Sequence, residues 1–162
     1  MPQIQVEEQT LDVVYSTRLL VVIFTSDMKW DEHIDSMVAK ARKKLWFLRR
    51  LKGFGASRNN LVELYKLFIR LTLEFAAPLW SGALTLKNKQ KLNRIQSNVT
   101  NLIIGPNNFN SEERDSLLRL QDLERRRLCL TEKFCKKMVE DDRFKHLFPR
   151  KTYKEPGAVT HL

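Results

Sequence analysis

The chain has 162 residues, of which 43% are hydrophobic and 30% charged, with a formal net charge of +10 and a pI near 9.8. This length suits one domain with a real core, and the composition excludes an intrinsically disordered chain. The longest apolar run, Leu19 to Phe24, is far below the roughly 20 residues of a membrane span, so we expect no membrane partner. Because nothing at the N-terminus looks like a signal peptide, we expect an intracellular protein, nuclear or cytoplasmic.

Residues 1–27 carry the predicted β structure. Residues 4–24 are rich in Val, Ile, Leu and Tyr, with breaks near Glu7–Gln9 and Ser16–Thr17. We predict two or three short strands, the last running from Arg18 to Phe24 with both faces buried. An isolated hairpin is marginally stable, so this hairpin should lie on the helices or belong to a larger sheet.

The stretch from Trp30 to Lys52 predicts an amphipathic helix that ends at the glycines of Gly53-Phe54-Gly55. Its apolar positions have the 4-3-4-3 spacing of a helix packed on a core: Ile34, Val38, Ala41, Leu45 and Leu48. From Ser36 onward this stretch contains no acid and seven bases: Lys40, Arg42, Lys43, Lys44, Arg49, Arg50 and Lys52. Trp46 and Phe47 should point outward, toward either a second protein layer or an anionic molecule with flat rings.

Two further helices are predicted before residue 105. Residues 60–77 are apolar over most of the helix circumference and should form the central core helix, ended by Pro78. The next helix should begin after an N-cap at Thr85 and end at Gly105-Pro106. It carries four bases and no acid: Lys87, Lys89, Lys91 and Arg94.

The last part of the predicted domain, from a Ser111 N-cap to about Asp141, is helical as one helix or two. The residues expected to face inward are Leu117, Leu120, Leu123, Leu130, Phe134 and Met138. Phe144, Leu147 and Phe148 should anchor its end. The fold class is therefore mainly α, a helical bundle preceded by a short N-terminal β-hairpin, with units at 1–27, 28–148 and a loose tail at 149–162.

No motif for catalysis, a cofactor or a metal was found. The sequence has no phosphate-binding glycine loop, no nucleophile elbow and no HExxH or CxxC pairing. The acids around Asp31 suit the start of a helix, and His33 has no second ligand at helical spacing. Cys129 and Cys135 should be free thiols of a reducing compartment. We therefore expect no catalytic residue, no metal and no cofactor.

The positive charge is uneven. Residues 1–35 carry two bases and seven acids, a net charge of −5, so the helical remainder carries +15. Ordinary solvated faces mix both signs, which favours nucleic-acid contact over a solvated surface. The candidate contacts are Lys40, Lys43, Lys44, Trp46, Phe47, Arg49, Arg50, Lys87, Lys91, Arg94, Arg125 and Arg126.

Several blocks together resemble one family. Arg18 to Val22 followed by Met28 to Ile34 resembles the "KYLGV…LxWxxHI" block after the palm of LINE-class (non-long-terminal-repeat, jockey/RTE-like) retrotransposon reverse transcriptases. Later blocks follow in the family's order, over about residues 18–137: Lys40-Ala41 with Leu48 to Leu51 ("KA…LRRL"), Leu64-Tyr65 with Leu73 to Trp80 ("LYxxLIRxxLEYAAPVW"), Leu92 with Arg94 to Gln96 ("LERIQ"), Ile104-Gly105 ("ILG") and Glu124 to Arg126 ("LExRR").

The resemblance implies the end of the palm plus the helical thumb and connection, which contacts the backbone of a template–primer duplex. The implied partners are RNA, an RNA–DNA hybrid or a DNA duplex, together with a palm and fingers segment. No YADD-like or FADD-like aspartate motif is present, so we expect no polymerase activity from this chain alone. Where the family has a "GLPTL" break between two helices, this chain has Arg119 to Leu123. Whether the two helices are fused into one therefore stays open.

Two other interpretations stay open at this point. The chain is either a helical protein-interaction or structural module, host-adopted, whose basic surface docks an acidic partner, or a decayed open reading frame with no selected function. Binding to RNA, duplex DNA and polyglutamate at several salt concentrations distinguishes a nucleic-acid site from nonspecific charge.

Overall fold

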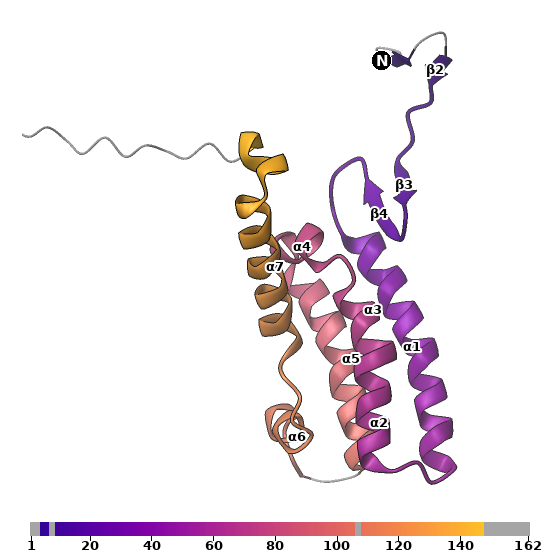
Figure 1. The fold of residues 1–162 in the computed structure, drawn as a ribbon. Helices are drawn as coiled ribbons and strands as arrows, with labels where there is room; N and C mark the ends of the chain where they lie inside the picture. Colours follow the sequence, from indigo (N-terminus) through magenta and orange to yellow (C-terminus); the bar gives the residue numbers. More distant parts are fainter. Residues whose placement is uncertain (1–3, 7–8, 106–107, 148–162) are drawn as a thin grey trace, which may run out of the picture.

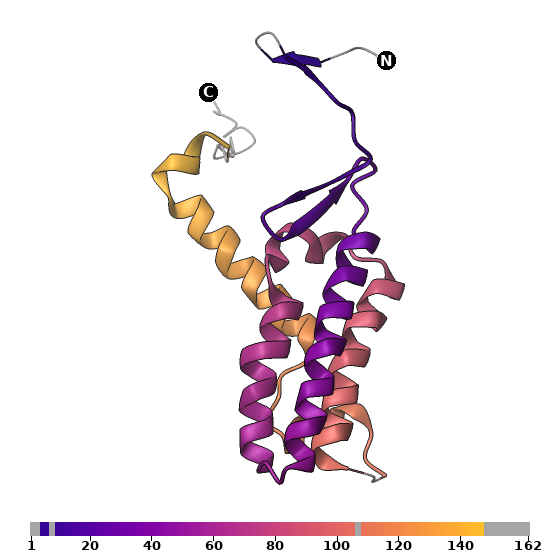
Figure 2. The same ribbon diagram turned by 90° about the vertical axis from the view of Figure 1, so that its right-hand side faces the viewer.

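Helices stand side by side in the molecule, and two short β-hairpins lie at one end of them (Figures 1 and 2). The computed structural model describes residues 4–6, 9–105 and 108–147, with the backbone alone for 4–6, 9–11 and 145. The prediction of a mainly α bundle with an N-terminal hairpin is confirmed. The division into units at 27 and 148 stays a prediction.

Helix α1, Asp31–Gly53, is the predicted amphipathic helix. All five residues of its predicted apolar stripe are buried, and His33 and Met37 join them. Asp31 and Glu32 lie in the first turn, where acidic side chains interact favourably with the helix dipole. The chain leaves the helix through Gly55, whose φ of +84° suits glycine.

The second helical column runs antiparallel to α1 and consists of α2 (Arg58–Leu64), a π-helical turn η1 (Tyr65–Arg70) and α3 (Leu71–Glu74). The Ser57 hydroxyl caps it by accepting a hydrogen bond from the Asn60 N–H at 3.2 Å. The prediction that Pro78 ends this helix is wrong. The break comes earlier, because Ala76 adopts the left-handed conformation, and Pro78 lies in the first turn of α4 (Ala77–Trp80), where a helix tolerates proline.

Only one side of this column is buried, so the prediction that it is the central core helix with an apolar circumference needs correction. Its buried apolar residues are Leu61, Val62, Tyr65, Ile69 and Leu73. Three large apolar side chains of this predicted core helix are exposed by about half: Phe68, Leu71 and Phe75. The core is shared among α1, this column and α5 instead.

A short 3-10 turn, η2 (Ser81–Ala83), leads to α5 (Leu86–Ile104), which runs parallel to α1. The Thr85 cap is confirmed, since its hydroxyl accepts from the Asn88 N–H at 3.3 Å. Contacts join the two helices at both ends: the Asn88 amide donates to Asp31, and the Lys52 ammonium donates to the Leu102 carbonyl. Helix α5 ends as predicted at Gly105, with φ +92°.

The C-terminal part forms two helices, α6 (Ser111–Leu117) and α7 (Leu123–Glu140), followed by a 3-10 segment η3 (Asp142–Leu147). The N-cap of α6 is Asn110, one residue before the predicted Ser111, and it forms a capping box with Glu113. The helices do not fuse, because Arg119 is left-handed and the Asp122 carboxylate caps α7 at the Arg125 N–H.

Much of α7 leaves the bundle (Figure 2), and several predicted inward residues are therefore exposed. Leu118 replaces Leu117 in the core, Leu120 and Leu123 are buried as predicted, and Leu130 and Met138 are half-buried. Phe134 and Leu147 are exposed, contrary to prediction, and Phe144 is half-buried. The predicted anchor Phe148 and the tail 149–162 lie outside the described residues.

The β region contains two antiparallel hairpins, β1 (Ile4–Val6) with β2 (Gln9–Leu11) and β3 (Ser16–Leu19) with β4 (Val22–Thr25). The predicted single strand from Arg18 to Phe24 is wrong. A turn at Leu20, which has a φ of +57°, divides it, and only β4 is buried, whereas Leu19 is exposed. The predicted break at Ser16–Thr17 falls inside β3. Figure 1 shows β1 and β2 standing away from the bundle.

Strand β4 docks on the helices through an aromatic cluster. The rings of Phe24 and Trp30 lie 5.6 Å apart, and His33 lies 6.0 Å from both Trp30 and Trp80. The Ile23 N–H donates to His33 Nδ1 at 3.3 Å, so the imidazole is neutral at this nitrogen. Burial, together with the nearby Lys40 charge, lowers the pKa of His33.

We expect the stability of the protein to fall as the pH drops below about 6.5. The pKa of His33 is lowered in the folded state, so the unfolded chain binds the extra proton first and acid favours unfolding. Protonation also removes the acceptor for the Ile23 N–H. Thermal unfolding between pH 7.5 and 5.5 measures this. His33→Asn keeps an acceptor that does not titrate and should flatten the dependence; an equally steep dependence in His33→Asn would assign it to other groups.

Candidate nucleic-acid interface

The outer side of α1 is a ridge of cations and aromatic rings. Trp46 is 61% exposed, and the Arg50 guanidinium carbon lies 5.8 Å from the centroid of its ring and equally far from that of Phe54. Lys43 and Arg50 are separated by seven residues, two helical turns, and therefore share this outward side. The ridge presents positive charge next to flat rings, as the sequence predicts.

Helix α5 extends this positive surface. Lys91 forms a salt bridge with Asp35 of α1, which marks the seam between the two parallel helices. Arg42 and Arg49 follow Asp35 at seven-residue intervals, so they continue along the same edge of α1. Lys87 and Arg94 lie four residues before and three after Lys91, on the matching edge of α5. The two edges form one surface.

We name this surface the α1/α5 basic face and define it by its exposed members: Arg42, Lys43, Trp46, Arg49, Arg50, Lys87 and Arg94. Among the described residues, none of its six cations has a carboxylate oxygen within 4.0 Å. Their charge is balanced by solvent and counterions alone, which makes this face attractive to a polyanion.

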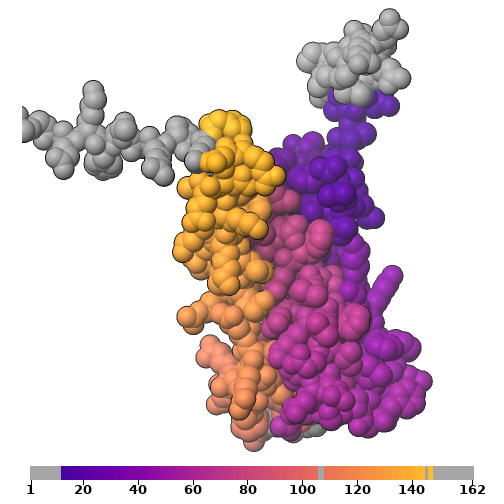
Figure 3. Space-filling model, in the orientation of Figure 1, coloured from indigo at the N-terminus to yellow at the C-terminus, as the bar shows by residue number. Residues whose placement is uncertain are grey.

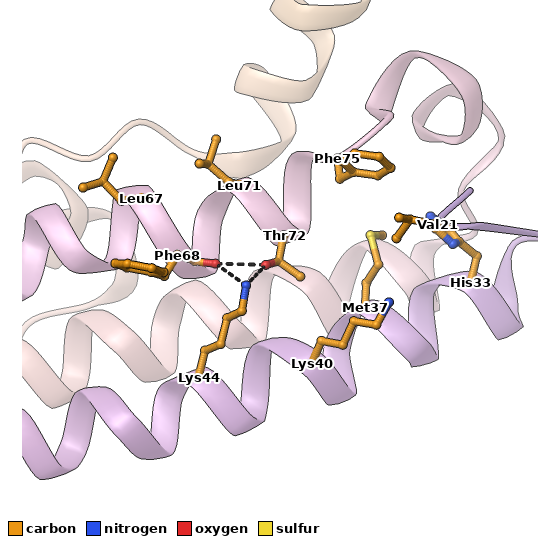
Figure 4. Close-up of a pocket in the computed structure, with 10 residues that line it drawn as sticks. All are labelled: Val21, His33, Met37, Lys40, Lys44, Leu67, Phe68, Leu71, Thr72 and Phe75. Atoms are coloured by element: carbon orange, nitrogen blue, oxygen red, sulfur yellow. Dashed lines mark hydrogen bonds between the residues drawn. The ribbon is translucent and has the colours of Figure 1, made fainter. Parts of the chain in front are cut away.

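Three of the predicted contact residues are instead occupied within the protein. Lys91 is bound to Asp35, as described. Lys44 donates to the Phe68 carbonyl at 2.9 Å and to the Thr72 hydroxyl at 2.6 Å (Figure 4). Arg126 makes two hydrogen bonds, of 2.5 and 3.0 Å, to the carboxylate of Glu74. These side chains hold helices together, so a ligand would have to compete for them.

The remaining predicted residues lie elsewhere. Arg125 is exposed on α7, which packs on α4 and α5 and stands on the opposite side of the bundle from α1 (Figure 1). Lys40 and Phe47 face the groove between α1 and the second column rather than the basic face. The structure thus separates Phe47 from Trp46, its neighbour in sequence.

Sequence reasoning left two features out of the predicted site. Arg42 belongs to the basic face although it is not among the predicted contacts; its seven-residue spacing from both Asp35 and Arg49 is the signal that could have found it. Glu74 is the other, because only the fold brings it to Arg126, across 52 positions. No local pattern indicates that pair.

Arg127 shows how differently three consecutive arginines can be placed. It is 2% exposed, and neither terminal nitrogen of its guanidinium has a hydrogen-bond partner among the described residues. Burial lowers its pKa, since the charged form loses its hydration. The side chain therefore contributes packing at an electrostatic cost.

Replacing Arg127 with Met is expected to raise the stability of the protein. Methionine fills a similar volume without a buried charge, and removing such a charge gains about 1 kcal/mol or more, or roughly 3 °C in melting temperature for a chain of this size. Differential scanning calorimetry measures the shift. Arg125→Met, at an exposed position in the same turn, is the control and should change little; a lower melting temperature in Arg127→Met would show that its charge is compensated.

Other chemistry has no candidate in the described part of the chain. Within it, no group of three or more His, Cys, Asp or Glu side chains could hold a metal ion. Cys129 is half-buried, Cys135 is exposed, and both are free. No helix among residues 4–6, 9–105 and 108–147 is long and apolar enough to cross a membrane. Comparisons with protein-family models, with curated proteins and with solved structures find no match.

Proposed function

We propose that the chain binds nucleic acid through the phosphate backbone, using the α1/α5 basic face. The observation that carries the proposal is the meeting of six exposed, unpaired cations from two parallel helices on one surface. Long Lys and Arg side chains reach phosphates without requiring a base sequence. Binding should therefore be independent of sequence and sensitive to salt.

Trp46 gives the face a second property. Its exposed ring lies beside the Arg50 guanidinium, and aromatic rings stack on unpaired bases or on sugars. A strand end or a single-stranded stretch next to a duplex offers such bases. We assign Trp46 this contact and the cations the neighbouring phosphates.

The resemblance to LINE-class reverse transcriptases extends the proposal to a substrate. If the resemblance extends to function, the chain acts as the thumb and connection next to a palm and fingers segment, and the duplex that it contacts is an RNA–DNA hybrid. The sequence carries no catalytic aspartate motif, so the function proposed for it is binding without polymerisation.

The experiment that tests the proposal is a titration of the wild-type chain with fluorescent 20-mers of RNA, RNA–DNA hybrid and DNA duplex, and with polyglutamate, at several salt concentrations. With about four phosphates neutralised, log K for B-form DNA should fall with a slope of roughly −3.6 against log salt. The nucleic acids should bind more tightly than polyglutamate. Equal binding of all four would favour the alternative, a basic module that docks acidic proteins; absence of binding at low salt would reject both.

A further inference from the structure

A groove lies between α1 and the second helical column, and of the residues that define the basic face only Lys43 borders it. One cavity of about 280 Å³ lies among Met37, Lys40 and Lys44 of α1 and Phe68, Leu71 and Phe75 opposite. A second, of about 350 Å³, shares Lys44 and Phe68 with the first and continues past Phe47 to Leu64. The two cavities adjoin and follow the helix axes.

The groove is bordered by large apolar side chains in contact with solvent. Phe47, Leu67, Phe68 and Leu71 are 56, 58, 55 and 57% exposed. Leu67 and Leu71 line the first cavity at its outer edge. Figure 4 shows their side chains pointing away from α1, and Figure 3 shows this column facing outward between α1 and α7. A contiguous apolar surface of this kind on a soluble protein marks an interaction site.

The π-helical turn η1 shapes this surface. Its wider turn changes which residues face the core, so Tyr65 and Ile69 are buried while Leu67 and Phe68 face solvent. Lys44 crosses the floor of the groove to the Phe68 carbonyl and fixes the turn to α1. The exposed apolar side chains of η1 therefore lie on a turn that is hydrogen-bonded to α1.

The spacing and charge of the groove define what fits it. Leu64, Phe68, Leu71 and Phe75 recur at intervals of four, three and four over roughly 17 Å, the length of three turns of a helix laid alongside. The rim formed by α1 is cationic, with Lys40 and Lys43 and no acid after Ser36. We propose that the groove binds an amphipathic helix of a partner protein that has an apolar stripe and acidic residues along its flank.

Other occupants fit this surface less well. In a symmetric dimer whose two-fold axis crosses the groove at right angles, the two lysine rims would face each other and repel. A nucleic acid would bind the lysines but leave the apolar side chains in water. A helix with acidic flanks covers the apolar surface and compensates the rim at the same time.

The test uses three synthetic 15-residue peptides with a fluorescent label. The first carries Leu at 4-3-4 spacing and Glu on its flanks, the second has Lys in place of Glu, and the third has the first composition with Leu spread around the helix. Fluorescence anisotropy should show at least tenfold tighter binding of the first peptide by the wild-type chain. Equal affinities for the first and third peptides would overturn the proposal, as would preference for the second.

Variants locate the binding site. Leu67→Asp/Leu71→Asp should weaken binding of the Glu peptide at least tenfold, and Lys40→Glu, which leaves the basic face intact, should shift the preference from the Glu peptide toward the Lys peptide. Leu128→Asp, at an equally exposed position on α7, is the control. Circular dichroism checks the fold, and RNA binding by Leu67→Asp/Leu71→Asp should stay at the wild-type level, which separates this proposal from the proposed function. Unchanged peptide binding, or self-association abolished by Leu71→Asp, would reject the acidic helix as occupant.

Discussion

Replacing Glu74 with Gln is expected to destabilise the protein by about 3 kcal/mol, because the change removes the charge from a buried ion pair. The Glu74 side chain is 5% exposed and accepts two hydrogen bonds from Arg126, while the Arg70 Nε lies 3.8 Å away. Without the carboxylate, Arg126 and Arg70 would lose the acidic group that they share. Chemical denaturation with urea measures the loss.

Glu63→Gln is the matched control. This glutamate also pairs with a cation, Lys66 at 2.7 Å, but the pair is exposed, and such pairs contribute less than about 1 kcal/mol. Combining Glu74→Gln with Arg126→Gln should recover part of the loss, since the double variant leaves one uncompensated charge fewer. Equal stability of Glu74→Gln and the wild type would show that the pair does not hold α7 to α3.

The second large effect concerns binding. Arg42→Gln/Lys43→Gln/Arg49→Gln removes three cations from the α1/α5 basic face, and we expect the affinity for an RNA–DNA hybrid to fall roughly 50-fold at low salt. The fold should be unaffected, because all three side chains are exposed. Electrophoretic mobility shift measures the affinity.

The control removes the same net charge from another surface. Lys133→Gln/Lys136→Gln/Lys137→Gln lies on the exposed part of α7, away from the face. Its affinity should fall only a few-fold, through the long-range field. If both triple variants lose affinity equally, net charge rather than a defined face explains binding.

Local patterns predicted the helices well. The stripe of α1 and the cap at Thr85 rest on residues within one or two turns of each other, so periodicity and capping chemistry suffice. The errors occur where backbone geometry departs from those rules. Left-handed Leu20, Ala76 and Arg119 make turns at residue types that rarely adopt this conformation, and sequence gives no sign of them.

The candidate site was only partly predictable for a related reason. The sequence indicates which helices are basic, but it cannot indicate which cations are paired across the fold. Lys91 pairs with Asp35, 56 positions away in sequence, and Arg126 pairs with Glu74, 52 positions away. Lys91 and Arg126 are therefore not among the unpaired cations. Several residues of the blocks that resemble the reverse transcriptase family are buried, such as Trp30, Glu74 and Gln96. They stabilise the bundle and lie away from the basic face.

The salt dependence of binding tests the central claim most directly. Affinity for an RNA–DNA hybrid would be measured from low to moderate salt for the wild type and for both triple variants. We predict that the slope of log K against log salt becomes shallower by about 0.9 for each lost phosphate contact in Arg42→Gln/Lys43→Gln/Arg49→Gln, and that it is unchanged in the α7 control. Identical slopes for all three proteins would contradict the assignment of the α1/α5 basic face.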